Sequence, residues 1–266
     1  MTPWILFRLD RDTDDEARVA ESIWKNRVYK YRSSLPYGVL VVGRYSVLPF
    51  YKELEDELAS RGSQLINRYY EHRFIADMEW VVPLDGLTPR TWFDTGWANA
   101  PDTEHGWVVK GRTNSRKFQW NTHMYAPDRD ALKTVIHRLY DDPMLSDQGL
   151  VIREYVPLKE FEEGINGMPV TNEWRCFFLY GELLSAGYYW SQAECAEEMG
   201  EIPEPALDLA SKAAKLISDS ATFCVIDVAE TAEGSWIVIE VNDGQMSGLS
   251  MNDPKVLYQN LWDALH

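Results

Sequence analysis

A nearly continuous apolar run, Tyr37–Gly43 (YGVLVVG), is the feature that most restricts how this chain can fold. Because the run offers no polar face to water, it predicts a strand that is covered on both sides, as in a parallel sheet between helices. Helical patterns flank it at Asp14–Asn26, which opens with acids, and at Phe50–Arg61, which ends before Gly62. With a further strand at Trp4–Leu9, the first third of the sequence predicts an α/β unit.

Beyond that unit, paired strands separated by helices indicate an α+β region. The stretch Pro83–Pro101 is rich in turn-forming residues and is the candidate boundary between the two parts. Strands are expected at Trp107–Lys110, Leu150–Tyr155, Glu173–Tyr180, Leu183–Trp190, Thr222–Ala229 and Trp236–Val241, and helices at Asp128–Tyr140, Pro205–Ser218 and Lys255–Leu265. The last four of these strands are expected to form two hairpins.

The charge of the chain disfavours some classes of partner. Its 26 Lys+Arg and 42 Asp+Glu give a net charge of −16, which disfavours nonspecific binding to duplex nucleic acid and a polybasic contact with a membrane. Its three cysteines form no CxxC pair, which fits a reducing compartment. Acids follow the short N-terminal apolar run at once, and no apolar run approaches the roughly 20 residues that span a bilayer. We therefore expect a cytoplasmic protein without membrane contact.

Several catalytic signatures are absent from the sequence. It contains no GxGxxG and no GxxxxGK[ST], so neither a dinucleotide fold nor a P-loop is indicated. It also contains no HExxH and no GxSxG, so the interpretation as a hydrolase gains no support. The chemistry is therefore sought in clusters of charged residues.

The first such cluster is basic. Lys110, Arg112, Arg116 and Lys117 place four cations and no acid within eight residues (KGRTNSRK) at the end of an expected strand. Ammonium and guanidinium groups in a loop can neutralise a polyphosphate, and the backbone amides of the loop add hydrogen-bond donors. The alternative is a solvated basic turn that balances nearby acids.

The second cluster is acidic and lies in two apolar strands. Asp227 follows Phe223–Ile226, and Glu240 and Asn242 stand two residues apart in the next strand, so that their side chains share one face. If the two strands pair, Asp227 joins them, and the three side chains offer the hard oxygen ligands that Mg²⁺ prefers. The alternative is that these acids lie on a face exposed to solvent. Between the two clusters, the run VIREYVPL carries Glu154, Tyr155 and Val156, where an apolar strand reaches a proline and frees backbone groups for a base edge.

Taken in order, these pieces resemble the ATP-grasp superfamily. A strand lysine (WVVK) precedes a phosphate-covering loop, and a linker (EYVPL), a strand with an arginine (NEWRCFFLYGELLSAG) and an acid followed by E-x-N (CVIDVA … IVIEVND) come after it. The resemblance covers roughly 107–248 and is greatest to a compact, divergent bacterial and phage clade whose phosphate loop is basic rather than rich in glycine. It implies an α+β ATP-grasp fold with an N-terminal α/β (pre-ATP-grasp) domain at 1–100. The catalytic domain is then 101–266, divided into a phosphate-loop lobe at 101–150 and a Mg²⁺-binding lobe at 151–266.

The resemblance also implies roles for single residues in binding ATP. Lys110 would contact the α- and β-phosphates, and Arg116 or Lys117 would reach the outer phosphates. The adenine pocket would be lined by Glu154, Tyr155 and Val156, the latter two chiefly through their backbone. Glu173 would contact the ribose or the linker.

Further roles concern the reaction itself. Arg175 and Lys117 are the expected catalytic residues, with Arg175 steadying the γ-phosphate or the acyl phosphate formed from it. Asp227, Glu240 and Asn242 would hold one or two Mg²⁺. From the residues alone, Arg44 is a candidate for holding the substrate carboxylate, because ligands bind at the carboxyl ends of strands in α/β units. A surface arginine without such a role is the alternative.

The function implied is an ATP- and Mg²⁺-dependent carboxylate–amine ligase that forms an amide bond through an acyl phosphate, with small-molecule or peptide substrates. Two alternatives stay open: phosphoryl transfer to another acceptor on the same fold, and a nucleotide-binding module without catalysis. The sequence names neither substrate and leaves the oligomeric state open.

Overall fold

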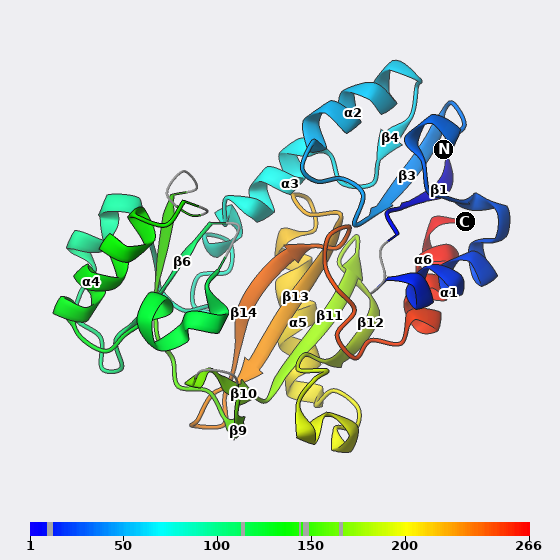
Figure 1. Ribbon diagram of the computed structural model, residues 1–266. Coiled ribbons are helices and arrows are strands. Elements are labelled where there is room, and N and C mark those ends of the chain that lie inside the picture. The colour runs from blue at the N-terminus through cyan, green and yellow to red at the C-terminus, as the bar shows by residue number, and fades with distance from the viewer. Residues whose placement is uncertain (10–12, 113–114, 144, 146–148, 165–166) are drawn as a thin grey trace.

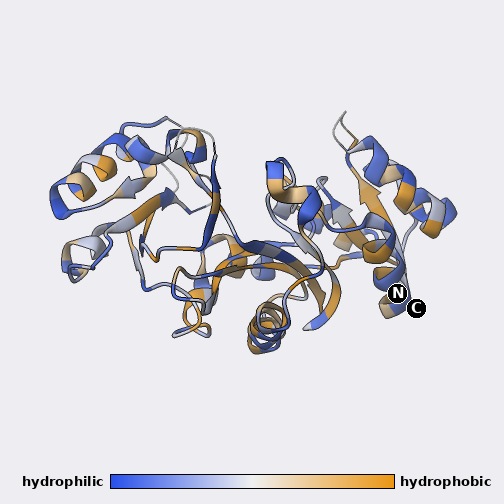
Figure 2. Ribbon diagram, turned by 90° about the horizontal axis from the view of Figure 1, so that it is seen from below, coloured by the Kyte–Doolittle hydropathy of each residue, from blue (hydrophilic) through white to orange (hydrophobic). Residues whose placement is uncertain are grey.

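The computed structural model of the protein describes residues 1–9, 13–112, 115–143, 145, 149–164 and 167–266. Three sheet-based parts follow one another across the molecule, with an N-terminal unit at one end, a central sheet and a small lobe at the other end (Figure 1). The two termini lie next to each other at the end formed by the N-terminal unit (Figure 2). None of the helices in the described ranges combines the length and the apolar character that a membrane span needs.

The N-terminal unit is a parallel sheet with helices on both faces, as the apolar run predicted. Its strands are β1 (Thr2–Phe7), β2 (Val28–Tyr29), β3 (Val39–Arg44) and β4 (Gln64–Leu65), in the order β2-β1-β3-β4. The helix α1 (Asp14–Trp24) packs with Ile5, Phe7 and Val42 on one face, whereas α2 (Tyr51–Ser60) packs with Leu6 and Val41 on the other. Successive residues of a strand point to opposite faces, so a strand that is buried twice has no polar position.

The central sheet is antiparallel and has the order β12-β11-β13-β14. Its strands are β11 (Glu173–Leu179), β12 (Glu182–Tyr188), β13 (Phe223–Glu230) and β14 (Trp236–Asp243), so both predicted hairpins are confirmed. The helix α5 (Glu204–Ile217) covers one face (Figure 1). The opposite face packs partly against α1 and α6 (Pro254–Leu265), and its remaining part carries polar side chains.

The small lobe is a four-stranded sheet backed by one helix. Its strands are β5 (Thr91–Phe93), β6 (Trp107–Gly111), β7 (Tyr125–Ala126) and β8 (Leu150–Glu154), in the order β5-β8-β6-β7. The helix α4 (Arg129–Tyr140) packs on it, and the Asp128 carboxylate caps its first turn by accepting from two backbone N–H groups. A small hairpin of β9 (Glu160–Glu163) and β10 (Pro169–Thr171) follows the lobe.

The predicted α+β class is confirmed, and most differences concern short elements. The sequence patterns did not reveal α3 (Tyr69–Ala76) or the strands of two to four residues, because such segments are too short to show a period. The stretch Pro83–Pro101 contains β5, which pairs with β8, and β8 itself lies in the small-lobe sheet. The expected divisions at 100 and 150 therefore cut across one sheet, and we propose that the small lobe begins at β5 and ends with β8.

The packing of α6 on α1 leads to a stability prediction. Leu261 is fully buried in the cluster that joins the two helices to the central sheet, so Leu261→Ala is expected to lower the free energy of unfolding by about 2–5 kcal/mol. The matched control is Val256→Ala on the same helix, which is 45% exposed and should change stability by no more than about 0.5 kcal/mol. Urea unfolding of both variants checks this, and equal losses would contradict the packing described.

Candidate active site

A cavity of 320 Å³ lies between the small lobe and the central sheet. Eight of the residues that the sequence singled out line it: Lys110, Lys117, Glu154, Tyr155, Val156, Glu173, Glu240 and Asn242. They come from β6, the loop after it, the end of β8 and the facing strands β11 and β14, which are far apart in the sequence. The structure therefore brings the basic loop, the linker and the acidic strands to one place.

One end of the cavity is apolar. Val108 and Met124 of the small lobe face Leu158, Met168 and Ile237 across it. Such a lining suits a flat heteroaromatic ring, because burial of apolar surface provides the affinity and a few polar groups fix the orientation.

The backbone of the linker offers one such polar group at this end. The N–H of Tyr155 donates to the carbonyl of Gly106 at 3.0 Å, whereas the N–H of Val156 has no hydrogen-bond partner among the described residues. The Glu154 carboxylate is held away from a ligand role by Arg90, to which it is hydrogen-bonded at 2.8 and 2.9 Å. Hydrogen bonds from Arg90 lower the pKa of Glu154.

The other end of the cavity is charged, with cations from the small lobe and carboxylates from the sheet. Lys110 contacts Glu240 directly, and the Nζ of Lys117 donates to the hydroxyl of Tyr189 at 2.8 Å. Burial would raise the pKa of Glu240, but Lys110 and Lys117 more than offset this and hold it well below its usual range. Glu240 is therefore ionised at neutral pH, and Lys110 and Lys117 stand where a polyphosphate would need cations.

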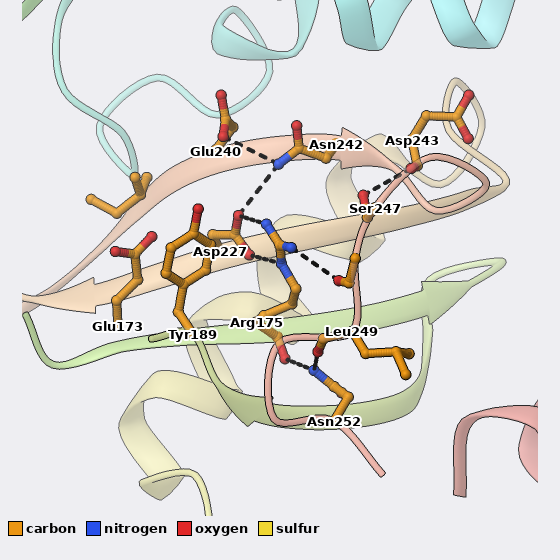
Figure 3. A network of polar contacts seen from close by, with 12 residues as sticks. Glu173, Arg175, Tyr189, Asp227, Glu240, Asn242, Asp243, Ser247, Leu249 and Asn252 are labelled. Carbon is orange, nitrogen blue, oxygen red and sulfur yellow. Dashed lines mark hydrogen bonds and ion pairs between the residues drawn. The ribbon is translucent and has the colours of Figure 1, made fainter. Parts of the chain in front are cut away.

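The acidic side chains form one network with Arg175 (Figure 3). Asp227 lies opposite Arg175 on one neighbouring strand and opposite Glu240 on the other. The guanidinium of Arg175 donates to both oxygens of Asp227, at 2.9 and 2.8 Å, and the Nδ2 of Asn242 lies 3.3 Å from an oxygen of Asp227 and from one of Glu240. The expected pairing of the two strands thus places all three expected metal ligands together.

This donor set fits a magnesium ion that phosphates help to hold. Two carboxylates and an amide are hard oxygen donors, and Mg²⁺ in proteins commonly takes only one or two carboxylates and completes its shell with phosphates and water. Within the described ranges, no group of three or more His, Cys, Asp or Glu side chains could hold a metal on its own. The predicted set, which includes Asn242, thus depends on ligands that a nucleotide would bring.

Glu173 is the most perturbed acid of the cavity. Its side chain is buried, and burial together with repulsion from Asp227 raises its pKa to about 8 despite Lys117 and Arg175 nearby. Glu173 is therefore largely protonated at neutral pH in this arrangement and can donate a hydrogen bond as well as accept one.

The structure distinguishes between the cations of the basic loop. Lys117 lines the cavity, whereas Arg116 pairs with Asp142 at 2.6 and 2.5 Å and does not line it. Arg112 pairs with Asp94 at 2.7 Å. The central residues of the loop, 113 and 114, lie outside the described residues.

Arg44 does not face the cavity, so its suggested contact with a substrate carboxylate is not supported by its position. It is fully buried and pairs with Glu16 at 2.7 Å. Its remaining donors bind the carbonyls of Gly244 and Ser247 and the hydroxyls of Tyr45 and Tyr258. Strand position alone suggested the wrong role because the loop after β14 covers this end of β3.

The sequence patterns missed two further residues at the site. Arg153 lines the cavity, donates to the carbonyl of Ile239 and to Thr88, and leaves its Nε without a partner among the described residues. Burial lowers its pKa to about 10. Tyr189 connects Lys117 to Arg175, whose guanidinium lies 4.7 Å from its ring. Arg153 could have been noticed as the single cation in an apolar strand, whereas Tyr189 left no signal in the sequence.

The fold and this site define a class, the ATP-grasp proteins. A family model described as an ATP-grasp domain, the third family of its clade, matches residues 95–261, which is more than half of the chain. The chain therefore belongs to this family, and the prediction of an ATP-grasp enzyme is confirmed. A comparison with curated proteins gives no match.

Solved structures agree on the fold. The chain is similar to D-cycloserine synthetase DcsG, with a TM-score of 0.68, 14% identity, and coverage of 99% of this chain and 100% of that one. It is similar to the ATP-grasp ligase PsnB complexed with a minimal precursor, with a TM-score of 0.62, 12% identity and full coverage of both chains. D-alanine–D-alanine ligase from Bacillus anthracis complexed with ATP matches with a TM-score of 0.53 and 15% identity, covering 91% of this chain and 85% of that one.

Loss of the Arg44 guanidinium is expected to destabilise the protein strongly. Arg44→Met leaves the buried Glu16 carboxylate without its cation, which should cost about 3–5 kcal/mol of the free energy of unfolding. Arg18→Met is the control, because the side chain of Arg18 is 72% exposed and its pair with Asp15 should contribute less than about 1 kcal/mol. Denaturant unfolding measures both, and similar values for the two variants would refute a structural role for Arg44.

The raised pKa of Glu173 predicts a pH dependence of stability. The pKa is 4.5 for an unperturbed glutamate and about 8 in the fold, so the folded protein keeps a proton that the unfolded chain loses between these values. The free energy of unfolding should therefore fall as pH rises from about 4.5 towards about 8. Glu173→Gln has no titrating group here, so its stability relative to the unmodified protein should rise across this range. A difference that does not vary with pH in urea unfolding would contradict the shift.

Proposed function

We propose that the protein is an ATP- and Mg²⁺-dependent ligase that joins a carboxylate to an amine through an acyl phosphate. The observation that carries the proposal is the cavity between the two lobes, which is apolar at one end and holds lysines opposite carboxylates at the other. A nucleoside triphosphate has the same division between an apolar base and a charged polyphosphate.

In this proposal the apolar end takes the adenine, and the N–H of Val156 donates to its edge. Lys110 and Lys117 exchange their present partners, Glu240 and Tyr189, for phosphate oxygens. Asp227, Glu240 and Asn242 would hold Mg²⁺, which when bound neutralises charge on the phosphates. Arg175 would donate to the phosphoryl group as it is transferred.

The reaction has two steps, and both depend on positioning. An oxygen of the substrate carboxylate attacks the γ-phosphorus, the bond from that phosphorus to the β–γ bridging oxygen breaks, and ADP leaves. The amine nitrogen then attacks the acyl carbon, inorganic phosphate leaves, and the nitrogen loses a proton to give the amide. Fixed cations and aligned reactants can provide most of the acceleration, so a histidine base is not required.

The nature of the substrates is proposed by analogy with proteins of the same fold. Those include a D-alanine–D-alanine ligase, an L-amino acid ligase from Bacillus licheniformis and a ligase complexed with a precursor peptide. We therefore propose small-molecule or peptide carboxylates and amines. A cytoplasmic location is part of the proposal, because the reaction consumes ATP.

The proposal predicts that ADP release requires a carboxylate and an amine together. Purified protein is incubated with ATP, Mg²⁺ and pairs of amino acids or short peptides, and ADP is measured by a coupled assay. Lys110→Ala and Arg175→Ala are expected to lower the rate by about 10²–10³, as is typical when a donor to transferred charge is removed. Lys133→Ala, on the exposed face of α4, is the control and should leave the rate unchanged.

Thermal unfolding with Mg²⁺–ADP separates the alternatives. Ligand at about 100 times its dissociation constant should stabilise the protein by about 2.7 kcal/mol, and this shift should be lost in Lys110→Ala. A shift without turnover under any substrate condition would indicate a binding module. A phosphorylated product that forms without amine would indicate a phosphotransferase, and no shift with a well-folded protein would refute nucleotide binding.

A further inference from the structure

A second cavity lies on the opposite face of the strands that carry the candidate active site. Its volume is 360 Å³, and it is enclosed by β11, β12, the segment before α5 and the loop before α6. Large apolar side chains line it: Trp174, Tyr188, Met199, Ile202, Leu207 and Met251. Glu201 is the single charged residue of the lining.

The surface around this cavity is acidic and lacks cations. From 176 to 211 the sequence contains no Lys, Arg or His. Five exposed acids of this stretch lie beside the cavity, on the 3-10 helix Glu194–Glu198, after it, and at the start of α5; they are Glu194, Glu197, Glu198, Glu201 and Glu204, and we call them the acidic rim. The hairpin strand β9 extends the rim, because Glu162 accepts a hydrogen bond from the N–H of Glu194 at 3.0 Å.

The carboxylates of the acidic rim differ from other exposed acids of the molecule. On α2, Asp56 pairs with Lys52 and Glu57 with Arg61, and on α4, Asp130 pairs with Lys133. No rim carboxylate forms an ion pair within the part of the chain that the structure describes. Like charges that gather without counter-charges destabilise the fold by repulsion and attract a cationic partner.

The second cavity shares a wall with the first. Tyr188 lines the second cavity, and its hydroxyl donates to the carbonyl of Thr171 at 2.9 Å. Thr171 lines the first cavity together with Trp190, whose Nε1 lies 3.3 Å from the Thr171 hydroxyl. A molecule held in the second cavity would therefore lie directly behind the candidate active site.

We propose that the second cavity and its acidic rim form a docking site for a basic peptide segment that carries a large apolar side chain. The apolar side chain enters the cavity, where its burial provides affinity, and the lysines or arginines next to it lie over the rim. A peptide fits better than a small cation, because the rim extends over two separate segments, 194–204 and β9. The site is separate from the ligase reaction and does not depend on it.

The test measures binding of a short fluorescent peptide of lysine and glycine with one central leucine. Fluorescence anisotropy is expected to show saturable binding that weakens as salt rises. A peptide with glutamate in place of lysine should not bind, and one with glycine in place of leucine should bind more weakly. Equal binding of the leucine and glycine peptides would overturn the proposal, because the cavity would then play no part.

Matched variants locate the binding on the surface. Glu197→Lys/Glu198→Lys reverses two charges of the rim, and Glu53→Lys/Asp56→Lys reverses two charges on α2, so both change the net charge equally. The rim variant should weaken binding by about tenfold or more, whereas the α2 variant should bind nearly as the unmodified protein does. Equal weakening in both would mean attraction to net charge alone and would overturn the proposal. Thermal unfolding confirms that each variant is folded.

Discussion

The ion pair between Arg175 and Asp227 is the constraint on which the candidate site depends. The Asp227 side chain is almost fully buried, and a carboxylate taken out of water without a partner would cost several kcal/mol. Arg175 satisfies both of its oxygens from the next strand, and Asn242 adds a contact from the strand on the other side. Glu240 and Lys110 continue the same network into the small lobe. Charges that would be costly one by one are thus held in a fixed arrangement, which preorganisation of a phosphoryl-transfer site requires.

A loop between two arginines connects this network to the N-terminal unit. Arg175 donates to the carbonyl of Gly248, and Arg44 donates to the carbonyls of Gly244 and Ser247. The loop directly follows Asn242, so the buried pair of Arg44 and Glu16 supports one of the proposed metal ligands from behind. The N-terminal unit is therefore part of the framework of the site, although it contributes no residue to the cavity lining.

The two faces of β11 carry different chemistry because of the period of a strand. Glu173 and Arg175 point to the candidate active site, whereas Trp174 points to α5 and the second cavity. The same alternation in β12 places Tyr188 in the second cavity, next to Tyr189, which contacts Lys117. A short piece of sheet thus lies between a charged site and an apolar one.

The sequence by itself determined what depends on local period and order. The apolar run at 37–43 predicted a doubly covered strand, and the spacing of Glu240 and Asn242 predicted a shared face, because both follow from the alternation of a strand. Only the tertiary structure decided which cation of the basic loop enters the cavity, since Arg116 and Lys117 differ in sequence by one position but meet Asp142 and Tyr189 in space. It also decided that Arg44 is interior, because the covering loop lies 200 residues further along the chain. Contacts of that separation leave no periodic signal in either segment, so they emerge only when the strands pack.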